Sequence, residues 1–241
     1  MQTRNYELLT FPNPQALARD AASQWLEQVR QLKTANFYGV ALAGGRIAVT
    51  FLQTVSSLAQ VGKVSLNAIH FFWGDERCVP PTSPDSNFRL ARENLLDPLG
   101  IAASQIHRVR GEADPAAAAA EAAADLCGLA GRNPSGQPVL DLILLGLGEN
   151  GHIASLFPEE PPEMVTDQAV YRPVLATKPP PRRITLGYPA INAARQVWVL
   201  ASGAGKEEAL RESLAPDGRT PLGRVMAQRI NTRIFTEIRL S

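Results

Sequence analysis

Histidine and cysteine are scarce in this sequence, with three histidines and two cysteines among 241 residues. So few histidines argue against a metal site built from several of them, and we expect no metal. Cys78 and Cys127 lie far apart and form no C-x-x-C pair, which argues against a disulfide framework and suits a reducing compartment. The formal net charge is only +1, so neither nucleic acid nor an acidic membrane surface is expected as a partner.

Long hydrophobic runs are absent as well. No stretch approaches the length of a membrane span, and the first residues do not open an apolar segment of the kind found in signal peptides. We therefore expect a cytoplasmic protein with no membrane partner. Hydrophobic residues at 45% and charged residues at 20% are typical of a globular protein, and the length suits a single domain over residues 1–241.

Short apolar runs alternate with helical patterns along the chain. Asn13-Pro14 and Asp114-Pro115 each supply a capping side chain followed by proline at the first helical position. Alternating apolar residues at 234–240 predict a late strand with one buried face. The other predicted strands cover residues 38–43, 68–73, 106–109, 142–145, 184–186 and 197–201. We therefore predict an α/β fold with a mostly parallel, Rossmann-like sheet and helices on both faces.

The apolar run at 142–145 is followed by three glycines and then by His152. A continuous apolar run bounded by turn residues indicates a strand that is buried on both faces of a parallel sheet. Open α/β sheets bind their ligands at the carboxyl ends of such strands. Imidazole titrates near neutral pH, so His152 is the candidate general base, acting on a bound water. The alternative for a lone histidine is a purely structural place in the core.

Residues 146–151 match G-x-G-x-x-G, the dinucleotide-binding fingerprint. That fingerprint opens a long helix in the first βαβ unit of its fold. Here Pro158, Pro161 and Pro162 forbid a long helix, and the motif lies past the middle of the chain. We therefore expect no nucleotide cofactor, and no other cofactor.

Asp75-Glu76-Arg77 places three charges at the end of the most aromatic predicted strand. These charges could form an ion pair with a structural role, because charges at a strand end are costly unless paired. They also lie at the sheet edge where the glycine turns emerge, which favours a role in the active site. Asp75 and Arg77 are the candidates for catalysis.

Several cations and glycines follow other predicted strands. Gly44-Gly45-Arg46 lies between a strand and a helix, where backbone N–H groups and the helix N-terminus favour an anion. Arg182-Arg183 and Lys206 add positive charge beside strand ends. Each of these alone is typical of a tight turn or a solvated charge. Together they predict a site for a dianion such as a sugar phosphate.

Other nucleophiles and bases have weaker support. Cys78 beside Arg77 could be an activated thiol, but no histidine–cysteine motif supports this. The sequence has no G-x-S-x-G elbow for a serine hydrolase, and Ser155 is better explained as a partner in the turn after His152. His70 and His107 lie in apolar strand patterns, so we interpret both as structural.

In order, these segments resemble the 6-phosphogluconolactonase family, which belongs to a wider group with glucosamine-6-phosphate deaminase and ribose-5-phosphate isomerase. The Ala-Ser-Leu-Phe-Pro ending of the histidine block favours the lactonase over its deaminase relatives, which carry a glutamate soon after the histidine. The resemblance spans nearly the whole chain and is carried by residues 72–81, 86–87, 144–158, 183–186, 189–195 and 205–206.

The resemblance implies hydrolysis of 6-phospho-D-glucono-1,5-lactone to 6-phosphogluconate in the pentose phosphate pathway. His152 would activate water, and Arg77 would stabilise either the oxyanion or the phosphate. The residues expected to hold the 6-phosphate are Gly44, Gly45, Arg46, Arg183 and Lys206, and Asn150 is expected to bind the substrate as well. The expected partner is the small-molecule substrate alone, and the chain is expected to be a monomer, with a weak dimer as the alternative.

Two positions depart from the family pattern. The early loop usually resembles Ser-Gly-Gly-Ser-Thr-Pro, whereas here Arg46 follows the glycines, so charge replaces hydroxyl contacts. The family commonly has aspartate where Asn150 stands. A neutral amide can orient His152 but cannot stabilise its imidazolium as a carboxylate would. Asp75, Glu76 or Glu149 could take that part.

Two other functions remain open on the residues alone. A deaminase or aldose–ketose isomerase acting on an amino-sugar phosphate would need a ring-opening acid/base and a carboxylate near C2. A non-catalytic sugar-phosphate sensor usually joins this kind of fold to a DNA-binding helix-turn-helix, and no such segment is apparent.

Overall fold

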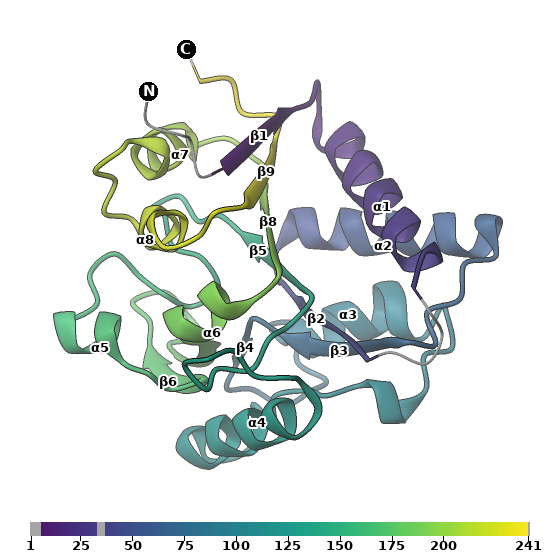
Figure 1. Ribbon diagram of the computed structural model, residues 1–241, viewed down its shortest axis with the longest axis horizontal. Helices are drawn as coiled ribbons and strands as arrows, with labels where there is room; N and C mark the ends of the chain where they lie inside the picture. The colour runs from purple at the N-terminus through teal and green to yellow at the C-terminus, as the bar shows by residue number, and fades with distance from the viewer. Residues whose placement is uncertain (1–5, 33–36, 241) are drawn as a thin grey trace.

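A six-stranded parallel sheet forms the centre of the computed structural model, which describes residues 6–32 and 37–240 (Figure 1). Every neighbouring pair in it is parallel. In spatial order the strands are β1 (Tyr6–Thr10), β9 (Thr232–Thr236), β8 (Gln196–Ala201), β5 (Leu142–Gly146), β2 (Tyr38–Leu42) and β3 (Ile69–Trp73). The predicted α/β fold with a mostly parallel sheet is confirmed.

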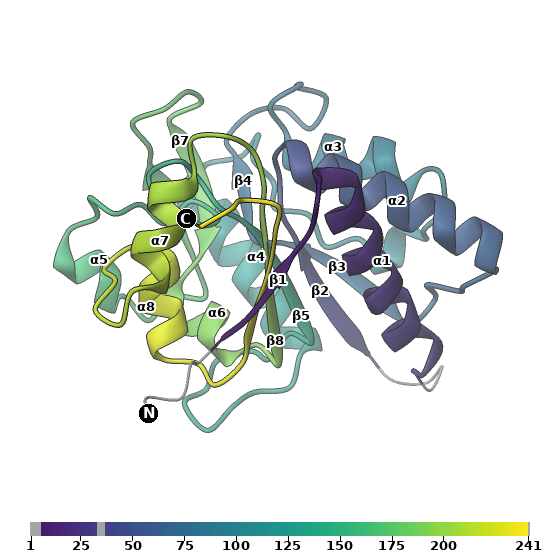
Figure 2. The ribbon, with the colours of Figure 1, turned by 90° about the horizontal axis from the view of Figure 1, so that it is seen from above.

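The central strands are apolar throughout because both faces of the sheet are covered. All five residues of β2 are buried, as are the first four of β5. Figure 2 shows α1 (Pro14–Arg30) and α2 (Arg46–Gly62) on one side of the sheet, and α6 (Tyr188–Ala193), α7 (Glu207–Leu214) and α8 (Pro221–Ala227) on the other. Burying a Leu or Ile side chain stabilises the fold by about 1.5–3 kcal/mol, so this two-sided core holds the strand ends rigidly in place.

The helix starts that the sequence predicts are confirmed. Asn13 Oδ1 accepts a hydrogen bond from the backbone N–H of Ala16 at 2.8 Å, and Pro14 is the first residue of α1. Asp114 caps α4 (Pro115–Leu129) in the same way. Helix α3 (Asn87–Ala91) continues into a π-helical turn (Arg92–Leu96). A separate 3₁₀ turn (Ala103–Gln105) and the short helix α5 (Pro162–Thr166) follow later in the chain. None of the described helices is long and apolar enough to cross a membrane.

A second, antiparallel sheet of three strands lies beside the first. Its strands, in the order β4 (Asp75–Arg77), β7 (Arg182–Leu186) and β6 (Tyr171–Leu175), are joined by antiparallel ladders. The Asp-Glu-Arg segment thus forms a strand of its own. The tyrosine hydroxyl of Tyr171 donates to the carbonyl of Trp73 at 2.7 Å and ties this sheet to the end of β3.

Several sequence-based expectations about individual strands are wrong. Residues 106–109 form only an isolated bridge between Ile106 and Phe71. The last strand stops at Thr236 and is buried on both faces, and β1 pairs with its outer edge. No sequence pattern described above predicts β1, β6, α6 or α8.

The connections diverge between β2 and β5. From β2 the chain proceeds to β3 at one edge of the sheet, whereas from β5 it proceeds to β8 and β9 towards the other edge. A crevice opens at such a switch point, outside the carboxyl ends of the two strands. The turns at these ends are the glycine-rich segments 43–46 and 146–151.

Candidate active site

A pocket of about 320 Å³ lies at this switch point. It is lined by the turns after β2 and β5, by the start of β4, and by the loop between β8 and α7. The predicted site residues that line it are Gly44, Gly45, Arg46, Asp75, Arg77, His152, Arg183 and Lys206. Asn150 lies behind His152 and does not line the pocket.

His152 is presented by a tight turn rather than by a helix. The backbone N–H of Gly148 donates to the carbonyl of His152 at 2.8 Å, and the N–H of Gly151 donates to the carbonyl of Gly148 at 3.0 Å. A Cβ at position 148 would lie 2.0 Å from atoms of the imidazole. Gly151 has a φ of 80°. Two of the three glycines are therefore required by the geometry that holds the ring, and no helix opens here to receive a dinucleotide.

Asn150 fixes the protonation pattern of the imidazole. Its Oδ1 lies 2.5 Å from His152 Nδ1 and also accepts from the backbone N–H of His152 at 3.4 Å. Because this oxygen can only accept, the neutral ring carries its proton on Nδ1. Nε2 is then left with a free lone pair, and this is the atom that a general base requires.

Burial lowers the pKa of His152 to about 4. The negative charge of Asp75 opposes this shift, whereas Arg183, Lys178 and Lys206 add to it. The imidazole is therefore neutral at pH 7 and available as a base without prior loss of a proton.

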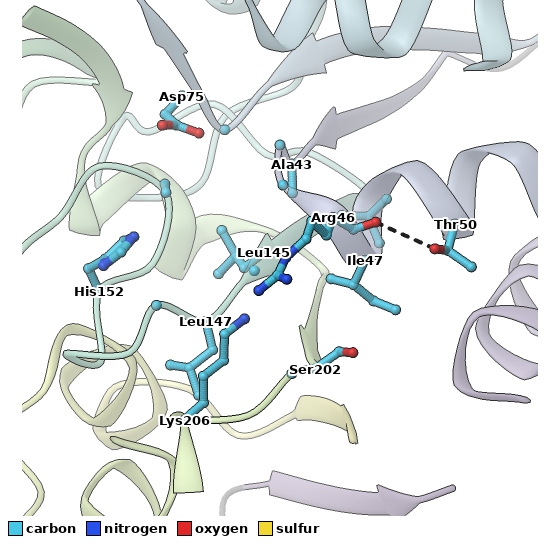
Figure 3. A pocket seen from close by; sticks show the side chains of 18 of the residues that line it. Ala43, Arg46, Ile47, Thr50, Asp75, Leu145, Leu147, His152, Ser202 and Lys206 are labelled. Atoms are coloured by element: carbon cyan, nitrogen blue, oxygen red, sulfur yellow. Dashed lines mark hydrogen bonds between the residues drawn. The ribbon is translucent and has the colours of Figure 1, made fainter. Parts of the chain in front are cut away.

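Asp75 faces the same pocket from the start of β4 and is only 6% exposed (Figure 3). Its Oδ2 accepts a hydrogen bond from the hydroxyl of Ser155 at 2.6 Å, and its Oδ1 accepts one from Asn87 Nδ2 at 3.2 Å. Neither contact is predicted from the sequence. Ser155 is three residues from His152, so this bond also ties the histidine turn to β4.

Glu76 points away from the pocket and has a structural role. Its carboxylate accepts hydrogen bonds from the backbone N–H groups of Arg77, Asn87 and Phe88, each at 2.7 Å, and from the hydroxyl of Ser86 at 3.1 Å. These contacts satisfy the N-terminus of α3. Burial raises the pKa of Glu76, and the backbone hydrogen bonds oppose that rise.

Arg77 and Arg183 lie beside Asp75. Arg77 Nη1 donates to the carbonyl of Asp85 at 2.7 Å. Arg183 donates to the carbonyls of Pro180 at 3.0 Å and Lys178 at 3.3 Å. Its guanidinium also lies 5.8 Å from the centroid of the Phe157 ring. Burial lowers the pKa of Arg183, and Asp75 is the first of the charges that oppose this effect.

Arg46 and Lys206 form a second group of cations. Arg46 is the first residue of α2, and Lys206 directly precedes α7. Figure 3 shows their side chains pointing toward one another in the pocket. Burial lowers the pKa of Lys206, and the positive charge of Arg46 adds to that shift. Glu237 and Glu149 oppose the shift, but among the described residues no carboxylate is hydrogen-bonded between the two cations, and this arrangement favours an anionic ligand.

The two early glycines have different roles. Gly45 has a φ of 94°, in the left-handed region that favours glycine. At Gly44 a Cβ would lie 2.0 Å from Asn87 Oδ1, so this glycine makes room for the amide that binds Asp75. The sequence shows both glycines but does not show that Asn87 is the reason for the first.

Comparison with known proteins identifies the family. A family model described as glucosamine-6-phosphate isomerases/6-phosphogluconolactonase matches residues 12–234. This chain belongs to that family. The resemblance seen in the sequence is thus confirmed.

Curated relatives within the family include the 6-phosphogluconolactonase of Mycobacterium tuberculosis, which is 38% identical over 184 residues, covering 73% of this chain and 72% of that protein. The 6-phosphogluconolactonase of Streptomyces coelicolor is 32% identical over 219 residues, covering 88% and 84%.

Among solved structures, that of 6-phosphogluconolactonase from Trypanosoma brucei superposes with a TM-score of 0.80 at 29% identity, covering 96% of this chain and 95% of that one. A monomeric glucosamine-6-phosphate deaminase also matches, with a TM-score of 0.78, but at 19% identity it shows a common fold only.

The remaining candidates in the sequence do not contribute to the pocket. Cys78 is half-buried, and burial together with the charge of Glu76 raises the pKa of its thiol, which argues against an activated nucleophile. His70 and His107 contact each other at 2.9 Å outside the pocket, although His107 is not in a strand. In the described part of the chain, no group of three or more His, Cys, Asp or Glu side chains could hold a metal ion.

Proposed function

We propose that this family member hydrolyses 6-phospho-D-glucono-1,5-lactone to 6-phosphogluconate, with His152 as the general base. The observation that carries the proposal is the free lone pair on His152 Nε2, in a pocket that also holds Arg46 and Lys206. The substrate has a neutral lactone ring and a phosphate dianion. A neutral base and two neighbouring cations in one cavity suit these two parts.

The cations determine which way the substrate lies. Arg46 and Lys206 would bind the 6-phosphate, with the N-terminus of α2 adding a favourable dipole. From the sequence, Arg183 is expected to bind the phosphate as well. However, the charged groups that act on its guanidinium are Asp75, Arg77 and Asp85, rather than Arg46 or Lys206. We therefore group Arg183 with Arg77 at the lactone end.

The reaction requires one base and one oxyanion donor. His152 Nε2 takes a proton from water while the water oxygen bonds to C1, and the carbonyl electrons move to the oxygen. Arg77 or Arg183 would stabilise that oxyanion, an effect typically worth 100-fold or more in rate. When the oxyanion collapses, the bond from C1 to the ring oxygen breaks, and the imidazolium returns its proton to that oxygen. The products are a carboxylic acid, which ionises at neutral pH, and a free hydroxyl.

A lactone needs no covalent nucleophile, because its carbonyl is already electrophilic. This agrees with the residues at the pocket. The hydroxyl of Ser155 donates to Asp75, and the thiol of Cys78 lies outside the pocket with a raised pKa. Direct attack by water is therefore the simplest route.

A coupled assay tests the proposal. Fresh phosphogluconolactone is generated by glucose-6-phosphate dehydrogenase, its conversion to 6-phosphogluconate is followed, and the spontaneous rate is subtracted. The proposal predicts saturable turnover above that rate. Turnover at the spontaneous rate, or ammonia release from glucosamine 6-phosphate by the same protein, would contradict it.

A further inference from the structure

The hydroxyl of Ser155 hydrogen-bonds to a residue 80 positions away in the sequence. It donates to Asp75 Oδ2 at 2.6 Å, and Ser155 itself is fully buried. Serine in a turn usually hydrogen-bonds to the backbone of its own loop. Here the turn is closed by the backbone, through a bridge between Ile153 and Leu156. The side chain is therefore not needed to form the turn.

The Asp75 carboxylate is held by neutral donors. Its two side-chain donors, Ser155 and Asn87, are both uncharged. None of the ion pairs in the described part of the chain includes Asp75. These donors orient the buried carboxylate without forming a salt bridge to it.

The carboxylate on the turn of His152, that of Glu149, lies 3.8 Å from Lys178 Nζ and is not among the charges that act on the ring. Asn150 contributes only an amide oxygen. The charged groups that act on the ring are Asp75 on β4, Arg183 on β7, Lys178 in the loop after β6, and Lys206 before α7. Three of these four are cations, so Asp75 supplies the counter-charge that favours the imidazolium.

We propose that Ser155 is a positioning residue that holds the Asp75 carboxylate toward His152, so that Asp75 stabilises the imidazolium formed during the reaction. This inference rests on the proposed function for its kinetic consequence, but its electrostatic part concerns the free protein. Ser155 reaches the substrate only through Asp75. Without its hydroxyl, Asp75 keeps a single, longer side-chain hydrogen bond, from Asn87 at 3.2 Å.

Histidine titration by NMR tests the electrostatic part without substrate. The protein has only three histidines, and His152→Gln identifies the resonance of His152. Ser155→Ala should lower the pKa of His152 by roughly half a unit or more, because the negative charge that opposes the lowering is no longer held in place. Asp75→Asn should lower it as well. In the Asp75→Asn background, Ser155→Ala should have little further effect, since no charge remains to be positioned.

Kinetics add a second readout. Ser155→Ala should lower kcat about 10-fold and change KM less than about 2-fold, since the loss concerns the transition state. Ser213→Ala is the matched control, because Ser213 is also buried but hydrogen-bonds to Ala209 and Thr220 instead. If Ser155→Ala does not fold, Ser155→Cys keeps the size of the side chain with a weaker donor and should shift the pKa of His152 in the same direction by less.

An unchanged pKa of His152 in Ser155→Ala would overturn the inference, as would an equal shift in the Asp75→Asn background. If the coupled assay shows no turnover by the wild type, the proposed function fails. The NMR comparison would still decide whether Ser155 positions Asp75.

Discussion

Asn150 Oδ1 and His152 Nδ1 lie 2.5 Å apart, and this contact sets which nitrogen of the imidazole can act as a base. The amide orients the ring as well as a carboxylate would, but it adds no negative charge. Burial and three nearby cations can then lower the pKa of His152 to about 4, and Asp75 is the counter-charge.

The fall of kcat/KM on the acid side of the pH profile should occur at an unusually low pH. The base must be unprotonated, and its lowered pKa leaves it so until the pH falls to about 4. Hence kcat/KM should stay nearly constant from pH 7 to about 5 and fall tenfold per pH unit well below 4. Initial rates in the coupled assay, or direct measurement of lactone loss at low pH, test this. A midpoint between pH 6 and 7 would contradict the assigned burial of the ring.

Asn150→Asp should move that fall of kcat/KM to higher pH. A carboxylate beside Nδ1 favours the imidazolium, so the pKa of His152 rises. Asn150→Ala should lower kcat instead, because the tautomer is no longer fixed, by roughly 10-fold or more. The pH dependence of kcat/KM for the two variants separates charge from orientation. Identical pH profiles for wild type and Asn150→Asp would show that the charge of residue 150 does not affect the pKa of His152.

Gly148→Ala should remove activity and keep the fold. The added Cβ would lie 2.0 Å from the imidazole, so the ring must leave its position. We expect kcat to fall at least about 100-fold, the amount attributed to a positioned general base. Circular dichroism checks the fold. Gly128→Ala is the matched control, because a Cβ there meets nothing within 4 Å and should leave kcat unchanged.

Lys206→Ala and Arg46→Ala should each raise KM about 10-fold or more, since each removes one charge from the proposed phosphate site. Inhibition by inorganic phosphate should weaken in parallel. Arg211→Ala, which removes an exposed cation paired with Glu208 on α7, should change neither value. A wild-type KM in both pocket variants would place the phosphate elsewhere.

Glu76→Ala should act on stability. The substitution leaves three backbone N–H groups and the Ser86 hydroxyl without their acceptor, at a cost of about 3 kcal/mol. Urea denaturation followed by circular dichroism measures the free energy of unfolding. Glu93→Ala, which breaks an exposed pair with Arg89, should cost less than about 1 kcal/mol. Equal losses in the two variants would argue against a stabilising role for the contacts between Glu76 and the start of α3.

The fold could be predicted where local chemistry and burial agree. The strands β2, β3 and β5 are continuous apolar runs, and the caps at Asn13 and Asp114 are read directly from side-chain chemistry. The strand β1 could not be predicted in this way, because its residues are at most half-buried. The strand β6 contains Pro173 and was missed for a different reason, since proline argues against a strand interior.

The site was predictable as a collection of residues but not as a network. Glycine turns and charges after parallel strands identify the pocket, because the carboxyl ends of these strands meet. Asp75 and Arg77 face the pocket whereas Glu76 does not, because these residues form strand β4 and successive side chains of a strand point to opposite faces. The bond from Ser155 to Asp75 joins the turn that carries His152 to strand β4 of the second sheet, and no local pattern in the sequence indicates it.

The most direct measurement is the kcat of His152→Gln in the coupled lactone assay, beside His107→Gln as a control at a histidine outside the pocket. The account predicts that kcat falls at least about 100-fold in His152→Gln, with KM within about 3-fold of wild type and no change in the control. A kcat equal to that of the wild type would remove the imidazole from the mechanism.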